Sequence, residues 1–106
     1  MPKYLFEAKY TAAGAKGVEH EGGSGRVAAV QKAVKGLGGK VEAFYFAFGE
    51  VDAYVIADLP DNVTAAAMAL SVDQSGMAST KTVVLLTMEE ADAATKKTVT
   101  YRGPGR

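Results

Sequence analysis

The sequence contains no cysteine, which excludes disulfides, thiolate nucleophiles and cysteine-based zinc sites. Stability must therefore come from core packing or from association with other chains. No apolar run approaches the roughly 20 residues that span a bilayer. Charged residues also follow the first methionine too early for a signal peptide. We expect a cytoplasmic protein with no membrane partner.

The sequence also lacks an excess of charge of either sign. Twelve basic and twelve acidic residues give a formal net charge of zero, so no broad positive field is available for a nucleic-acid backbone. Nucleic acid is therefore not an expected partner. The length of 106 residues, 48% of them hydrophobic, suits one domain with a substantial core.

Hydrophobic patterning predicts four strands. Their expected ranges are 3–10, 41–48, 51–59 and 79–86. The first strand places Tyr4, Phe6, Ala8 and Tyr10 on one side. In the last strand the apolar residues 83–86 are nearly continuous, as in a strand covered on both faces.

Three helices are expected between and after these strands. The first runs from Arg26 to Leu37, with Ser24 as its N-cap, and ends at Gly38-Gly39. The second is capped by Asp61, carries Met68 and Leu70 on its apolar side and ends near Gln74. The third follows a capping box formed by Thr87 and Glu90. The glycine-rich stretch 11–25 is expected to be a surface loop.

The element order β-α-β-β-α-β-α predicts an α+β fold. With right-handed crossovers it gives a ferredoxin-like four-stranded antiparallel sheet with two helices on one face and a short C-terminal helix. We assign residues 1–95 to this domain. Residues 96–106 form a tail outside the core, which is either disordered or an arm packed on a partner subunit.

A two-residue Gly49-Glu50 turn would fix the register of the central hairpin. One face then holds the pairs Phe48–Val51, Phe46–Ala53, Phe44–Val55 and Glu42–Ala57, and the other holds Ala47–Asp52, Tyr45–Tyr54 and Ala43–Ile56. The first face is expected to pack under the helices. The second would leave an apolar patch exposed in a monomer. We therefore expect a homodimer, or a higher homo-oligomer, that pairs sheet to sheet.

Several segments carry a family resemblance. They are KYTAAGAKG, GGSGR, LGGKVEAFYFAFGEVDAYVIADLPDN, LLTMEEAD and YRGPG. Together they resemble the GYD domain family over essentially the whole chain. The resemblance implies a ferredoxin-like fold that pairs as a dimeric α/β barrel, and a general function that is poorly defined. In the family signature a tyrosine precedes the aspartate after the turn glycine. Gly49 and Asp52 match that signature, but Val51 replaces the tyrosine, so no role of that tyrosine carries over.

The only histidine, His20, is a candidate for proton transfer or ligand contact, because histidine titrates near neutral pH. The alternative is a solvated loop histidine. One histidine beside glutamates lacks the spacing of a metal site, so neither a metal nor a cofactor is expected.

The segment Gly22–Arg26 is a candidate anion site. Glycine amides at a helix start, together with the Arg26 guanidinium, could surround an anion. The alternative is a flexible loop in which Arg26 pairs with a nearby carboxylate.

Tyr45, Asp52 and Tyr54 form a third candidate set, because they project from neighbouring strands on one face. A carboxylate partly withdrawn from water beside phenols could have a raised pKa and act as a base or bind a ligand. The alternative is structural: Asp52 fastens the turn, and the tyrosines are interface anchors.

Two functional classes remain open. One is a noncatalytic binding or assembly module. The other is a cofactor-independent enzyme, oxygenase- or isomerase-like, that acts on a small organic molecule held between sheet and helices. We favour the noncatalytic class, because one histidine and no cysteine do not assemble a nucleophile, a base and an orienting group.

Overall fold

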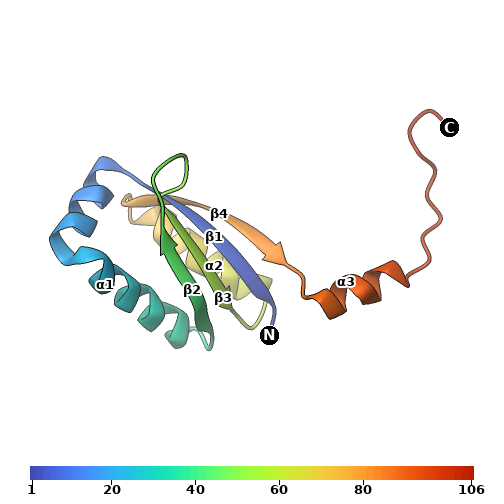
Figure 1. The fold of residues 1–106 in the computed structure, drawn as a ribbon, viewed down its shortest axis with the longest axis horizontal. Coiled ribbons are helices and arrows are strands. Elements are labelled where there is room, and N and C mark those ends of the chain that lie inside the picture. The colour runs from blue at the N-terminus through green and yellow to red at the C-terminus, as the bar shows by residue number, and fades with distance from the viewer.

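The computed structural model describes all 106 residues, in the element order β-α-β-β-α-β-α. Strands β1 to β4 span Lys3–Tyr10, Lys40–Phe46, Ala53–Asp58 and Ala78–Leu85. Helices α1 to α3 span Ala12–Gly36, Asn62–Gln74 and Met88–Thr95. The strands form one antiparallel sheet in the order β2-β3-β1-β4 (Figure 1). The predicted ferredoxin-like α+β fold is confirmed.

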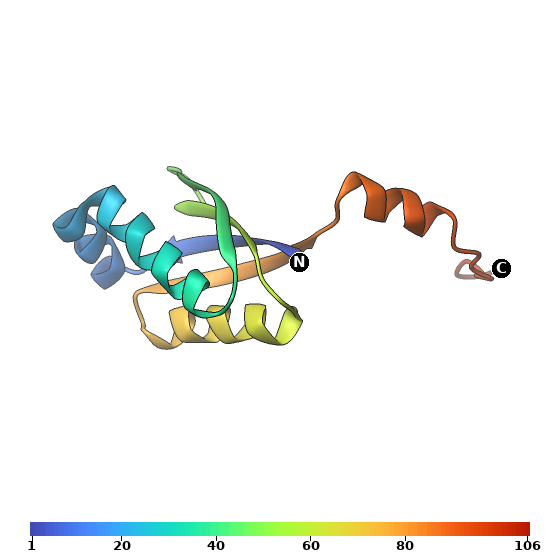
Figure 2. The ribbon, with the colours of Figure 1, turned by 90° about the horizontal axis from the view of Figure 1, so that it is seen from below.

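The core lies between one face of the sheet and the helices α1 and α2. Tyr4 and Phe6 of β1 are buried and alternate with partly exposed residues, as a strand with one covered face requires. They pack with Val34 of α1 and Ala65 of α2. The Tyr4 hydroxyl donates a hydrogen bond to Oδ1 of Asn62 at 2.6 Å, which satisfies the one polar group of this buried side chain. Figure 2 shows α2 running beneath the β1–β4 half of the sheet.

The prediction of a loop over residues 11–25 is wrong, because residues 12–25 belong to α1 and Thr11 is its N-cap. Thr11 caps the helix in place of the expected Ser24: its Oγ1 accepts a hydrogen bond from the Gly14 N–H at 3.1 Å. A kink at Gly22, with φ 79° and ψ 164°, divides the helix. Residues from Arg26 onward are helical as predicted, and Gly38 ends the run with φ 82°.

Contacts with the segment before β4 explain why the glycine-rich stretch folds as a helix. The Thr11 N–H donates to the Met77 carbonyl at 2.9 Å, and the Thr11 hydroxyl donates to the Gly76 carbonyl at 2.8 Å. Gly14 lies so close to the Met77 backbone that a Cβ atom would collide with the Met77 carbonyl oxygen. Tertiary contacts therefore outweigh the low helix propensity of glycine.

The predicted hairpin register holds for four pairs: Phe46–Ala53, Tyr45–Tyr54, Phe44–Val55 and Ala43–Ile56. It then fails, because a β-bulge at Glu42 shifts the pairing so that Val41, and not Glu42, meets Ala57.

The hairpin tip is longer than the predicted two-residue turn. It spans residues 47–52, and Gly49 lacks the positive φ that a primed turn requires there. The Asp52 N–H donates to the Ala8 carbonyl of β1 at 2.9 Å, so the chain before β3 is drawn toward β1. Phe48, expected under the helices, is fully exposed.

The second half of the fold follows the sequence more closely. Asp61 caps α2 as predicted, accepting the Thr64 N–H at 2.8 Å. Met68 packs against the core, but Leu70 is exposed. The expectation that β4 is covered on both faces is also wrong, since large parts of Val83 and Val84 are exposed.

Helix α3 and the tail project away from the body of the molecule (Figures 1 and 2). The predicted capping box is present: Glu90 N–H donates to Thr87 Oγ1, and Thr87 N–H donates to Glu90 Oε1. No residue of α3 is buried. The radius of gyration, 16.7 Å, exceeds the value of about 13 Å typical of a compact chain of this length. The projecting segment accounts for this difference.

Candidate functional site

A pocket of about 340 Å³ lies between the sheet and the two packed helices. Helix α1 packs mainly against β2, and α2 packs against β4. These two strands form opposite edges of the sheet, so the inner faces of β1 and β3 form the floor between the helices. The pocket is thus a consequence of the strand order and of the spacing of the helices.

Small side chains keep this space open. Alanines contribute to the lining from both sheet and helix, namely Ala8, Ala29, Ala33, Ala53 and Ala78. Larger apolar groups, including Phe6, Phe44, Val55 and Met68, form the rest of the inner wall. Fourteen of the eighteen lining residues are hydrophobic, so the pocket suits a mainly apolar molecule.

The polar groups that line the pocket differ in whether they have a hydrogen-bond partner within the chain. The Ser75 hydroxyl donates to the Val72 carbonyl at 2.6 Å, and the Thr80 hydroxyl donates to Oδ1 of Asp73 at 2.9 Å. Nε of Arg26, in contrast, is buried without a hydrogen-bond partner. It lies 3.4 Å from Oε1 of Glu21, an ion pair without hydrogen-bond geometry. A buried donor of this kind is rare in folded proteins.

Tyr10, at the end of β1, also lines the pocket and is only partly exposed. Burial raises the pKa of Tyr10 above its ordinary value, and the positive charge of Arg26 offsets only part of that rise. The phenol therefore stays protonated at neutral pH and can donate a hydrogen bond. Arg26 and Tyr10 thus join the hydroxyl residues Ser71, Ser75 and Thr80 as the polar groups of a mainly apolar pocket.

The structure brings only some of the predicted site residues together. Arg26 lines the pocket, and its proximity to Glu21 matches the carboxylate pairing considered from the sequence. His20 is exposed on α1 and does not line the pocket. The glycines before Arg26 lie in the kinked helix and not in an open loop, and Gly23 lies against the Phe46 ring.

Asp52 binds the hairpin tip to β1. This is the structural role considered from the sequence as the alternative to a catalytic or ligand-binding role. Its Oδ2 accepts the Tyr10 N–H at 2.9 Å, and its Oδ1 accepts a hydrogen bond from Lys9 Nζ at 3.2 Å. These hydrogen bonds hold the pKa of Asp52 below its ordinary value, and the bond from the Tyr10 N–H has the largest effect. The structure therefore does not give Asp52 the raised pKa that a base at neutral pH would need.

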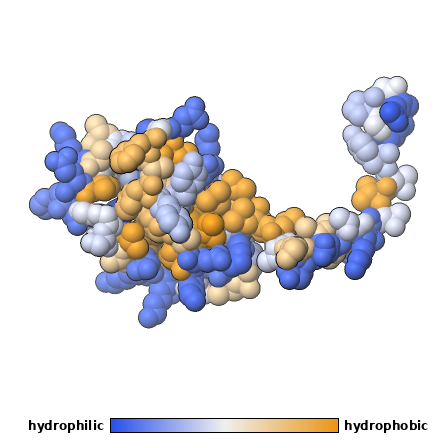
Figure 3. Space-filling model, in the orientation of Figure 1, coloured by the Kyte–Doolittle hydropathy of each residue, from blue (hydrophilic) through white to orange (hydrophobic).

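Tyr45 and Tyr54 pair directly across β2 and β3, on the sheet face opposite the helices. Tyr45 is 71% exposed and Tyr54 is 38% exposed. We call this surface the outer face. By strand alternation it also carries Leu5, Ala43, Ile56, Val83 and Leu85. Figure 3 shows apolar surface over the strands that continues onto the segment before α3.

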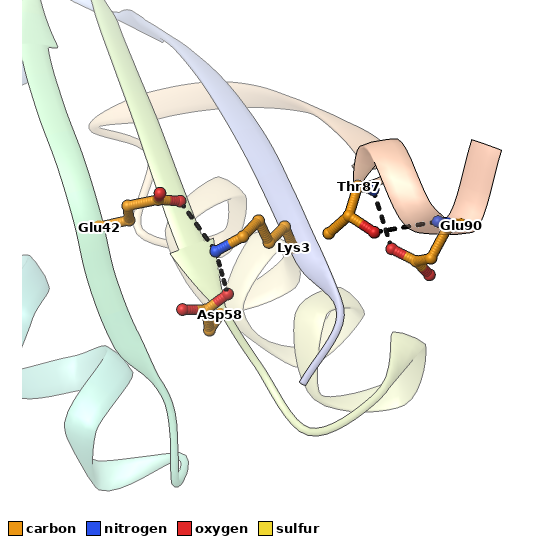
Figure 4. A network of polar contacts seen from close by, with 5 residues as sticks. All are labelled: Lys3, Glu42, Asp58, Thr87 and Glu90. Carbon is orange, nitrogen blue, oxygen red and sulfur yellow. Dashed lines mark hydrogen bonds and ion pairs between the residues drawn. The ribbon is translucent and has the colours of Figure 1, made fainter. Parts of the chain in front are cut away.

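A charged cluster borders the outer face where β1 begins (Figure 4). Lys3 Nζ lies 2.9 Å from Oδ1 of Asp58 and 3.1 Å from Oε2 of Glu42. Hydrogen bonds to Asp58 and then Glu42 raise the pKa of Lys3. The bulge at Glu42 thus brings a carboxylate of β2 to a lysine of β1 across the intervening strand.

Sequence reasoning considered a pocket between sheet and helices but missed the residues that line it, apart from Arg26, and the role of Tyr10 in it. The one available signal was the alternation of β1, which places Tyr10 on the same side as the core residues Tyr4 and Phe6. No three histidine, aspartate or glutamate side chains converge as ligands for a metal ion.

The fold and the pocket define the class of protein: a ferredoxin-like α+β domain with an apolar pocket between its sheet and two helices. A family model described as the GYD domain matches residues 4–95, and the chain therefore belongs to the GYD domain family. No curated protein and no solved structure matched the chain. None of the helices combines the length and apolar character needed to cross a membrane.

Proposed function

We propose that this protein is a noncatalytic, homodimeric binding module that holds a small, mainly apolar organic molecule between its sheet and helices. The pocket carries the proposal. Its volume of about 340 Å³ lies within the range of roughly 300–1,000 Å³ that is usual for small-molecule sites. By the volume of a water molecule in the liquid, about 30 Å³, the space suits a ligand on the order of ten non-hydrogen atoms.

The side chains of the pocket favour binding over catalysis. Arg26 stays protonated in proteins, and Tyr10 keeps its proton because burial raises its pKa. The polar part of the pocket therefore offers hydrogen-bond donors, whereas an oxygenase- or isomerase-like reaction would begin with a base. Asp52, the carboxylate proposed for that role, is held ionised by its bonds to β1.

Ala29 and Ala28 offer a matched test of ligand binding. Both lie in α1, but only Ala29 lines the pocket. We expect the neutral fluorophore 1-aminoanthracene to bind the wild-type protein with increased emission. Ala29→Phe should abolish this binding by filling the pocket, and Ala28→Phe should preserve it. Absence of binding to the wild type, or equal binding by both variants, contradicts the proposal.

The dimer part of the proposal is supported by the outer face. Helices cover the other side of the sheet, so the apolar residues here meet water in a single chain. Pairing with a second copy would bury Tyr45 and Tyr54, and tyrosines are enriched in protein interfaces. The Lys3 cluster at the border would then form part of a polar rim.

The projecting segment supports association as well. An isolated helix shorter than about 12 residues is marginal in water, and α3 has eight residues and no buried side chain. Leu86, Met88, Val99 and Tyr101 are all exposed on or beside it. We propose that this segment is an arm that packs on the partner subunit.

A further inference from the structure

The wall of the pocket contains one cationic group, the guanidinium of Arg26. Arg26 Nε is buried and makes no hydrogen bond, although about a third of the Arg26 side chain is exposed. Nε itself faces the Glu21 carboxylate and is closed to solvent, so a ligand in the pocket would meet the exposed part of the Arg26 side chain. Because Arg26 is one of the residues that line the pocket, a ligand acceptor that pairs with this exposed part would lie inside the pocket.

Tyr10 gives the same part of the pocket a second donor. Tyr10 and Arg26 both line the pocket. The backbone of Tyr10 is fixed by its N–H bond to Asp52. An acid in the pocket therefore has two donor side chains in the surrounding wall.

We propose that the ligand is an organic carboxylic acid, with its carboxylate at Arg26 and Tyr10 and its apolar body among the alanines of the pocket. This inference rests on the proposed binding function and names the ligand class for the same pocket. A carboxylate suits the site because its hydrogen bonds to a guanidinium are charge-assisted, and because one carboxylate can accept from several donors.

Two carboxylates lie near these donors, and a bound acid would have to displace only the one that pairs with Arg26. Asp52 is occupied by the Tyr10 N–H and by Lys9. Glu21 is the carboxylate beside Arg26, and both side chains of this pair are about one-third exposed. Such partly exposed pairs contribute little to stability, so Glu21 can turn to solvent when an acid enters. Glu21 is therefore a competitor of the ligand.

Three probes of matched size test this inference: 4-phenylbutanoate, 4-phenylbutanamide and 4-phenylbutylamine. Calorimetric titration of the full chain should show the acid binding on the order of tenfold more tightly than the amide, because hydrogen bonds between charged groups are stronger than neutral ones. The amine should bind most weakly. Equal binding of acid and amide, or preference for the amine, overturns the inference.

Two variants make the test specific to the arginine. Arg26→Met keeps an apolar stem and should remove the preference for acid over amide, whereas Glu21→Gln should strengthen acid binding and leave amide binding unchanged. Thermal melts would verify that both variants are folded. If the acid preference survives in Arg26→Met, or if Glu21→Gln does not strengthen acid binding, the inference fails.

The controls separate this inference from the proposed function. Binding of acid and amide with equal affinity, both lost in Ala29→Phe, would leave the binding function in place and reject only the ligand class. Failure of all three probes and of 1-aminoanthracene to bind would reject both.

Discussion

Gly14 and Gly17 lie in the same part of α1 but have opposite surroundings. A Cβ atom on Gly14 would strike the Met77 backbone, whereas a Cβ on Gly17 would meet nothing within 4 Å. One glycine permits a helix to approach the chain before β4, and the other only lowers helix propensity. A glycine-rich composition does not distinguish these two environments, and for this reason the sequence predicted a loop here.

This difference gives a prediction at the residue scale. Gly14→Ala should lower the free energy of unfolding by about 1–3 kcal/mol, because the backbone of Met77 has to move. Gly17→Ala should raise it by up to about 1 kcal/mol, because alanine favours the helix. Urea unfolding followed by circular dichroism measures both changes. A stabilising Gly14→Ala would show that the close contact does not exist in solution.

Features set by neighbouring residues could be predicted from the sequence at this scale. Asp61 as a helix cap and the Thr87–Glu90 capping box are local hydrogen-bond patterns, and both are confirmed. The glycine-rich motif before Arg26 indicated an anion site. It could not show that Arg26 lines a pocket, because the other walls of that pocket come from the sheet and from α2. Asp52 was ambiguous for the same reason, since its partners are in β1.

At the scale of elements, the strands and α2 were predictable because periodicity and caps agreed. The register of the hairpin was correct over four successive pairs, from Phe46–Ala53 to Ala43–Ile56, but the two-residue turn at its tip was not. Gly49-Glu50 resembles a tight turn locally, yet bonds from Asp52 to β1 hold the chain in a longer connection. The bulge at Glu42 likewise accompanies a contact with Lys3 that no local pattern contains.

The outer face of the sheet and helix α3 are exposed in the single chain, and we therefore expect the protein to associate. Light scattering of the full chain should give a dimer of 22.0 kDa, twice the 11.0 kDa of one chain. Tyr54→Glu should shift the mass to that of a monomer, because it places a charge in the interface. Val63→Glu is the control: Val63 is also exposed, but it lies on α2.

Removal of residues 87–106 tests the arm separately from the outer face. The truncated chain should dissociate at concentrations where the full chain is a dimer. A truncated chain that dimerises as well as the full chain would show that α3 has no role in pairing. A full chain that scatters as 11.0 kDa at micromolar concentration would reject the dimer itself.

At the scale of the whole molecule, the pocket arises from the spacing of the layers. Helices packed toward opposite edges of a four-stranded sheet leave a space between them, and alanines on both sides do not fill it. The sequence predicted the layers and even a ligand between them, but not whether side chains would fill that space. Packing volumes decide this question, and they depend on residues far apart in the chain.

The central claim is that this pocket binds an organic molecule, and alanine-methyl NMR tests it most directly. On titration with 1-aminoanthracene, the methyl signals of Ala29, Ala33 and Ala53 should show ring-current shifts. Those of Ala43 on the outer face and Ala91 in α3 should stay unchanged. Unshifted pocket methyls, or larger shifts at Ala43 than at Ala53, would contradict the claim.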